Sequence, residues 1–161
     1  MVFELVTATG STTPGSERFN GAVNFLASKV NDEKGTLATA DTAKIFLGLQ
    51  IQCTQCHNHP FNNWKQSQFW QLNAFFRQTR LLRSYEGTEV SGARLVDEDF
   101  AGEGGDPNEA EVYYELRNGL LKVAYPVFVD GTALTDLLGE EIGNHGYLAD
   151  VNRRVELAKL V

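Results

Sequence analysis

The chain has 161 residues, enough for one domain with a hydrophobic core, and hydrophobic residues make up 42% of it. Its formal net charge of −7 argues against nucleic acid as a partner, because phosphate binding relies on clustered Lys and Arg side chains. No stretch of about eighteen apolar residues occurs, so the sequence predicts no membrane span. Its first residues lack the basic segment and the apolar core of a signal peptide.

Helices dominate the predictions for the first half of the chain. Hydrophobic spacing predicts a short helix over residues 3–9 and an amphipathic helix that begins at Asn20, a capping residue, and ends near residue 30. We expect Thr36 to cap a third helix, which continues to the cysteines and contains Gly48. The missing side chain of Gly48 has two interpretations: it admits another backbone or a flat ring, or the helix merely tolerates it.

An aromatic helix and two short strands are predicted next. Residues 64–77 combine aromatic side chains at helical spacing with polar ones, and residues 81–85 and 92–96 have the pattern of strands. The acidic, glycine-rich segment 97–109 lacks the ordered carboxylate spacing of a calcium loop. We therefore expect a solvated loop there rather than a metal site.

The clearest turn signal lies further along the chain. Asn118-Gly119 separates the apolar runs 111–116 and 120–125, and this dipeptide accepts the positive φ angles of a two-residue turn. The sequence therefore predicts a β-hairpin. Asp150 is expected to cap a final amphipathic helix that continues to residue 160.

The strongest motif is Cys-Thr-Gln-Cys-His-Asn-His-Pro at residues 53–60. Cys53, Cys56 and His57 form the C-x-x-C-H signature of covalent haem attachment. Two thiols must add to the two vinyl groups of one porphyrin, so they must lie about a helical turn apart. The imidazole directly after the second thiol then becomes the proximal iron ligand. The chain has two cysteines in all, so no other pairing competes for them, and we predict one covalent haem c with His57 as its proximal ligand.

Two other kinds of site use a pair of cysteines at this spacing. A structural zinc site normally takes four ligands from two separated pairs. The chain has no second cysteine pair, so zinc would need His57 or His59, and then His145 or a carboxylate. A thioredoxin-like dithiol needs a strand before the motif and a helix after it, whereas a helix is predicted before these cysteines. We favour haem over both.

The ligand on the opposite face of the iron is less defined. Met1 is the only methionine and is terminal, which disfavours the His/Met pairing of many cytochromes c. His59 is two residues from His57, too short a tether to pass around a porphyrin edge, so we expect it to bond a propionate, the backbone or the neighbours of His57. His145 is far enough away in sequence to reach the distal face and is our candidate distal ligand, although an exposed loop histidine is the simpler interpretation. A Lys or Tyr donor and an open site are the other options.

Aromatic side chains surround the motif in sequence. Aromatic stripes more often form plain core than a cofactor wall. Here a large flat cofactor must be buried close by, so we predict that some of these rings contact the haem. The predicted cofactor contacts are Phe46, Phe61, Trp64 and Trp70, together with His59.

Residues 43–76 resemble the planctomycete-type cytochrome c domain, a family of haem c domains in large exported proteins of planctomycetes and related bacteria. The resemblance rests on an F-L-G-containing helix, C-x-x-C-H, the run H-P-F, a Trp and an aromatic helix. Weaker similarity covers residues 5–10 and 125–131, and residues 153–158 are similar to the approach to the domain that usually follows.

The resemblance implies haem c bound to Cys53 and Cys56 with His57 proximal, and it matches His59 to the second histidine of the family. It also implies an exported protein, periplasmic or in the cell envelope, and we expect the sequence to be part of a longer one. The expected partners are a redox protein or adjacent domains of the same polypeptide, and a homodimer is an option.

Together these features predict one α+β domain over residues 1–161, mainly helical around a covalently bound haem c with a small antiparallel β-hairpin or sheet insertion. Electron transfer is the first functional hypothesis, because haem shuttles one electron while the protein sets its potential. The alternatives are a five-coordinate haem module with an open distal face, for catalysis or small-gas binding, and a zinc-stapled structural module. No nucleophile–base pair or phosphate loop supports hydrolytic chemistry.

Overall fold

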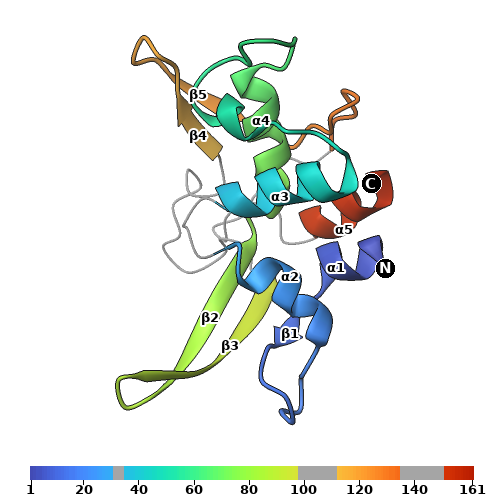
Figure 1. Cartoon of the computed structure of the whole chain (residues 1–161), viewed down its shortest axis with the longest axis vertical. Coiled ribbons are helices and arrows are strands. Elements are labelled where there is room, and N and C mark those ends of the chain that lie inside the picture. Colours follow the sequence, from blue (N-terminus) through green and yellow to red (C-terminus); the bar gives the residue numbers. More distant parts are fainter. Residues whose placement is uncertain (31–34, 98–111, 135–150) are drawn as a thin grey trace, which may run out of the picture.

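The structure, a computed structural model, describes residues 1–30, 35–97, 112–134 and 151–161. In this part of the chain, helices form the body and two small antiparallel sheets accompany them (Figure 1). The predicted α+β class is therefore confirmed, whereas an arrangement around a haem stays a prediction. None of the described helices is both long and apolar enough to cross a membrane.

The helical elements include α-helices and short 3₁₀ helices. In chain order they are α1 (Val2–Thr7), η1 (Gly21–Val23), α2 (Asn24–Ala27), α3 (Thr36–Phe46), η2 (Gln52–Gln55), α4 (Gln66–Asn73), η3 (Ala74–Phe76) and α5 (Arg153–Leu160). The strands are β1 (Gly10–Ser11), β2 (Thr79–Glu86), β3 (Glu89–Asp97), β4 (Val112–Glu115) and β5 (Leu121–Ala124).

The third helix differs from its prediction, because α3 ends at Phe46 and does not reach the cysteines. Gly48 has a φ of +68°, a left-handed conformation that glycine adopts without strain. The amides of Leu47 and Leu49 both donate to the Ala43 carbonyl, at 3.1 and 3.0 Å, and close this helix end. A Cβ atom on Gly48 would meet no atom within 4 Å. The glycine therefore serves the turn and is not a tolerated position inside a helix. No other backbone of the described residues approaches it, and approach of a flat ring stays a prediction.

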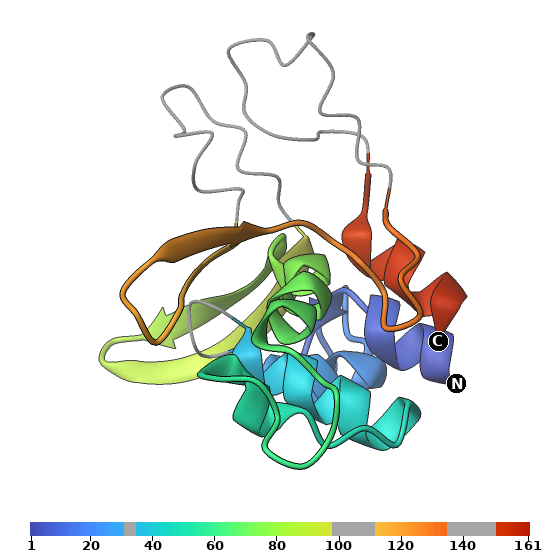
Figure 2. The same cartoon turned by 90° about the horizontal axis from the view of Figure 1, so that it is seen from above.

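The larger sheet has the strand order β1-β3-β2 and is antiparallel throughout. Strands β2 and β3 form a long hairpin that extends away from the helices in both views (Figures 1 and 2). Gly87, with a φ of +63°, lies in its turn. The second sheet is the predicted hairpin of β4 and β5, and Gly119 adopts the expected positive φ of +82°. The predicted strands at residues 81–85 and 92–96 and the predicted hairpin around Asn118-Gly119 are therefore all confirmed.

The hydrophobic core centres on α4 and η3. Phe69, Leu72 and Phe75 are fully buried there. The facing side of α3 carries small side chains such as Ala43, which let the two helices approach closely. The Asn73 amide donates to the Thr39 hydroxyl at 2.9 Å across this contact. The pair satisfies two buried polar groups that would otherwise oppose burial.

The last helix is part of the core. Arg154 has no exposed side-chain surface. Its guanidinium pairs with Asp97 at the end of β3, at 2.7 and 2.6 Å, and also donates to the carbonyls of Val6 and Ala8, at 2.8 and 3.0 Å. One buried cation thus joins α5, β3 and the end of α1. The predicted cap Asp150 lies outside the described residues, and the side chain of Asn152 caps α5.

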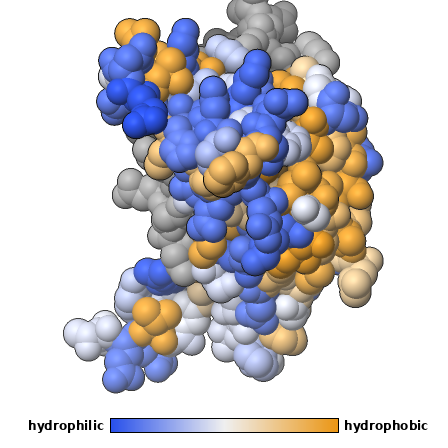
Figure 3. Space-filling view, turned by 45° about the horizontal axis from the view of Figure 1, so that its top comes forward, coloured by the Kyte–Doolittle hydropathy of each residue, from blue (hydrophilic) through white to orange (hydrophobic). Residues whose placement is uncertain are grey.

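The surface is unevenly polar. In Figure 3 apolar atoms gather on the right of the view, the side on which Figure 1 places α1 and α5. These two helices pack against each other, and the two chain ends lie together in both ribbon views. The exposed apolar side chains of this helix pair include Phe3 and Leu160.

Candidate functional site

The two cysteines lie on a short 3₁₀ turn. Cys53 belongs to η2, Cys56 follows its last residue, and both are free and exposed. Thr54 between them is buried, and its amide donates to the carbonyl of the buried Ile51 at 2.9 Å. The turn therefore directs one residue inward and presents both thiols outward. A 3₁₀ turn, rather than the C-terminal end of α3, positions the motif.

The carbonyl of Gln55 fixes this turn to the rest of the molecule. It accepts a hydrogen bond from the Trp70 indole Nε1 and another from the Gln66 Nε2, each at 3.0 Å. The same Gln66 nitrogen donates to the carbonyl of Glu115 in β4 at 2.8 Å. Two buried side chains of α4 thus hold the peptide unit between the two thiols and tie it to the second sheet.

Trp70 is itself fixed by an aromatic contact. Its ring stacks on Tyr114 of β4, with centroids 5.9 Å apart and an interplanar angle of 12°. Desolvation by burial raises the pKa of Tyr114 above its ordinary value of 10.0. The phenol therefore stays neutral well into the alkaline range, and no charge disturbs this stack at neutral pH.

The two histidines of the motif take opposite tautomers. His57 Nδ1 lies 2.6 Å from the carbonyl of Asn58, and a carbonyl only accepts, so Nδ1 carries the proton. His59 Nδ1 accepts from the amide of Phe61 at 3.1 Å, so its proton lies on Nε2. In the neutral imidazole, these contacts leave a lone pair on Nε2 of His57 and none on Nε2 of His59. Of the bonds expected for His59, the one to the backbone is present.

The segment after the motif forms a closed turn. The amide of His59 donates to the carbonyl of Trp64 at 2.8 Å. The amide of Gln66, the first residue of α4, donates to the side chain of Asn58 at 3.0 Å. These bonds fix the path of the chain directly after His57, so the imidazole lies on an ordered backbone.

The predicted aromatic contacts differ in their surroundings. Trp70 is buried and bonded to the motif, and Trp64 is half-buried at the end of the following turn. Phe61 is 92% exposed. Phe46 packs against Phe25 of α2, with ring centroids 5.2 Å apart. Contact with a haem stays a prediction for all four.

The remaining findings concern the candidate distal ligand, metal clusters and the contacts made by Gln66. His145 lies outside the described residues. Within the described residues, no group of three or more His, Cys, Asp or Glu side chains is arranged to hold a metal ion. No pattern in the sequence indicates the roles of Gln66 and the Gln55 carbonyl, because both depend on contacts between separate segments.

The fold and the site define a small α+β domain that presents a C-x-x-C-H motif on an anchored 3₁₀ turn. Residues 1–81, half of the chain, match the PSCyt2 family, described as a protein of unknown function (DUF1549) and associated with planctomycetes. The chain therefore belongs to this family. The matched residues include the whole C-x-x-C-H motif and α4. Searches of curated proteins and of solved structures found no match.

Proposed function

We propose that the domain is a monohaem c-type cytochrome that transfers electrons through a haem attached to Cys53 and Cys56. The observation that carries the proposal is the contact of His57: its Nδ1 lies 2.6 Å from the Asn58 carbonyl, which leaves Nε2 of a neutral imidazole free to bind iron, directly after two free, exposed cysteines in the chain. Ligating histidines characteristically donate their other ring N–H to a carbonyl or carboxylate in this way.

The donor set fits a haem c. The two Sγ atoms would form the thioether links, and His57 Nε2 would bind the iron. When bound, the haem supplies a reversible one-electron couple whose potential the protein tunes by ligation, burial and hydrogen bonding.

The neighbouring side chains have supporting roles in this proposal. Trp70 and Gln66 hold the peptide unit between the thiols, which limits how far the two sulfur atoms can move relative to each other. Trp64 and Phe61 would supply apolar cover to a flat cofactor. His59, already bonded to the backbone through Nδ1, would shape the turn rather than bind the iron.

The proposal extends to location and partners. Attachment of haem to C-x-x-C-H normally takes place outside the cytoplasmic membrane, so we propose an exported protein, periplasmic or in the cell envelope. Electrons would pass to a redox partner protein or to adjacent domains of the same polypeptide.

The test is export of the chain in a host that has haem-attachment machinery. We expect the purified protein to have the mass of one covalent haem above the polypeptide, a Soret band, and reversible reduction. A Cys53→Ser/Cys56→Ser variant should lose the added mass, whereas His59→Asn should keep it. A wild-type protein with the apoprotein mass and no Soret band would refute the proposal, and zinc in that colourless protein would support the structural alternative. A spectrum that shifts when carbon monoxide is added to reduced protein would instead favour the five-coordinate alternative.

A further inference from the structure

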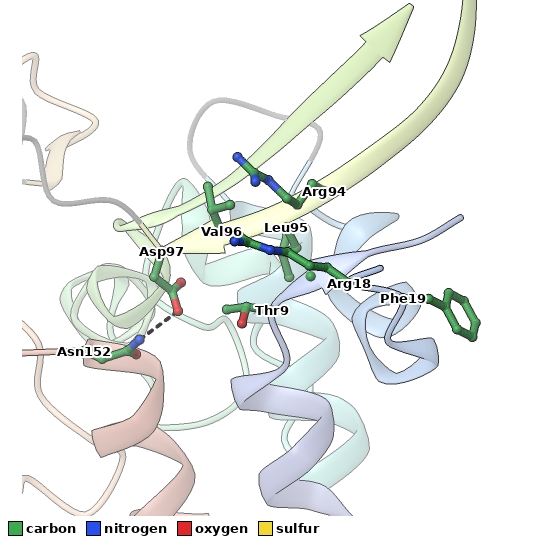
Figure 4. A pocket seen from close by; sticks show the side chains of 9 residues that line it. Thr9, Arg18, Phe19, Arg94, Leu95, Val96, Asp97 and Asn152 are labelled. Atoms are coloured by element: carbon green, nitrogen blue, oxygen red, sulfur yellow. Dashed lines mark hydrogen bonds between the residues drawn. The ribbon is translucent and has the colours of Figure 1, made fainter. Parts of the chain in front are cut away.

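A second candidate site lies away from the cysteines, beside the three-stranded sheet. A pocket of about 500 Å³ lies between β1, the segment at Arg18, β3 and the start of α5. Figure 4 shows the side chains that line it. Two arginines, Arg18 and Arg94, line it together with Asp97 and Asn152. A volume of this size is ordinary for a pocket that binds a small molecule.

Backbone pairing brings the two arginines together, although 76 positions separate them in the sequence (94 − 18). Ser11 of β1 is paired with Arg94 on β3, and its amide donates to the carbonyl of Arg18 at 2.7 Å. The two arginines therefore lie on the segments that flank β1, roughly 10 Å apart at the backbone by two strand spacings. In Figure 4 both guanidinium groups point toward the end of the pocket at Val96, while the ring of Phe19 points away from it. Both side chains are long enough to meet at one ligand.

Gly10 makes this arrangement possible. It has a φ of +121°, and a Cβ atom built on it would lie 2.6 Å from the carbonyl oxygen of Arg18. A side chain at this position would push the Arg18 segment away from β1 and open the wall of the pocket. The close approach of the backbones thus depends on a residue without a side chain.

The side chains of the two arginines have no partner in the part of the chain that the structure describes. Neither guanidinium group makes a hydrogen bond or an ion pair there, and both residues are exposed. The carboxylate of Asp97 is already taken, since it pairs with Arg154 and accepts from Asn152 at 2.8 Å. Among the described residues, therefore, no carboxylate pairs with either guanidinium group at this pocket, in a chain whose net charge is −7.

We propose that the pocket formed by Arg18 and Arg94 binds a small molecule that carries an oxyanion, either a phosphate or a carboxylate group. Two planar guanidinium groups that line one pocket offer paired N–H donors to such a group, and charge-assisted bonds of this kind are among the stronger hydrogen bonds in proteins. The proposal uses no residue of the C-x-x-C-H motif. It holds or fails independently of the haem proposal.

The test measures binding of inorganic phosphate and of succinate to the full 161-residue chain by titration calorimetry at constant ionic strength. We expect saturable binding of at least one of them, and the tighter of the two identifies the oxyanion class. Arg18→Gln and Arg94→Gln should each weaken binding about tenfold or more, as expected for the loss of a hydrogen bond to a charged group.

The matched control is Arg117→Gln, which removes the same charge from an exposed arginine between β4 and β5. It should leave binding unchanged. Absence of saturable binding in the wild type, or equal weakening in all three variants, would overturn the proposal. Because the three arginines are exposed, thermal unfolding should show that every variant keeps the fold.

Discussion

The indole Nε1 of Trp70 donates a hydrogen bond to the carbonyl of Gln55 at 3.0 Å, and so joins the buried face of α4 to the peptide unit between Cys53 and Cys56. An exposed pair of thiols is thereby positioned from inside the core. The relationship makes the geometry of the candidate site depend on a side chain that is not itself at the surface.

Replacing Trp70 by Phe should lower the free energy of unfolding by about 1–3 kcal/mol, because the indole donor and part of the packed ring are lost. Denaturant unfolding followed by circular dichroism would measure this. Trp64→Phe is the control, since the half-buried Trp64 indole makes no hydrogen bond within the described residues. Equal losses in the two variants would show that the bond to Gln55 contributes nothing specific.

Gly48→Ala should cost about 1 kcal/mol, because a φ of +68° is strained for any residue with a Cβ atom. The surrounding space is open, so the loss reports conformation alone. Gly21→Ala, at a position in η1 without a positive φ, should cost less. If Gly48→Ala were neutral in thermal unfolding, the left-handed end of α3 would be wrong.

The buried pair of Arg154 and Asp97 should behave differently from the exposed pair of Lys159 and Glu156. Arg154→Met leaves a carboxylate with fewer partners and two bare carbonyls, and we expect a loss of about 3–5 kcal/mol. Lys159→Met should change stability by less than about 1 kcal/mol. Chemical denaturation of both variants tests this, and similar small losses would argue that Arg154 is solvated.

Titration of Tyr114 gives a prediction with a defined sign. Burial raises its pKa in the folded state, so the stability it contributes is fully present below the ordinary value of 10.0 and is lost as pH rises through the higher folded-state pKa. Phenolate absorbance should show a late-titrating phase that belongs to Tyr114. Tyr114→Phe should abolish that late phase, whereas removal of the exposed Tyr85 should leave it in place.

The opposite tautomers of His57 and His59 predict unequal effects of substitution in haem-loaded protein. His59→Asn should leave the visible spectrum unchanged, because an amide oxygen can accept the Phe61 N–H in place of Nδ1. His57→Asn should alter the Soret band and shift the reduction potential, because the proposed iron ligand is lost. The reverse pattern would assign the ligand to His59.

Local signals predicted several elements correctly. The Asn118-Gly119 dipeptide located the β4–β5 hairpin, and the aromatic spacing located α4, because both signals act within a few residues. The end of α3 was predicted wrongly although Gly48 marks it. A glycine inside an apolar run has the same sequence pattern whether it ends a helix or lies within it.

The contacts that anchor the candidate site could not be predicted from the sequence. Gln66 belongs to the polar positions of an aromatic helix, and only the packing of η2 and β4 against α4 turns it into a buried donor. The burial of Arg154 could not be predicted from the sequence either, because arginine is rarely buried unless it is paired and the pairing depends on the fold. Its partner Asp97 is the first residue of the acidic segment 97–109, whose composition predicts a solvated loop.

The bonds from Arg154 to the carbonyls of Val6 and Ala8 span 148 and 146 positions of the chain. During synthesis, therefore, the first helix leaves the ribosome long before Arg154, whose guanidinium donates to these carbonyls, has been made. In a nascent chain these two carbonyls wait for their donor until almost all of these residues have emerged, and contacts of such long range slow the final closure.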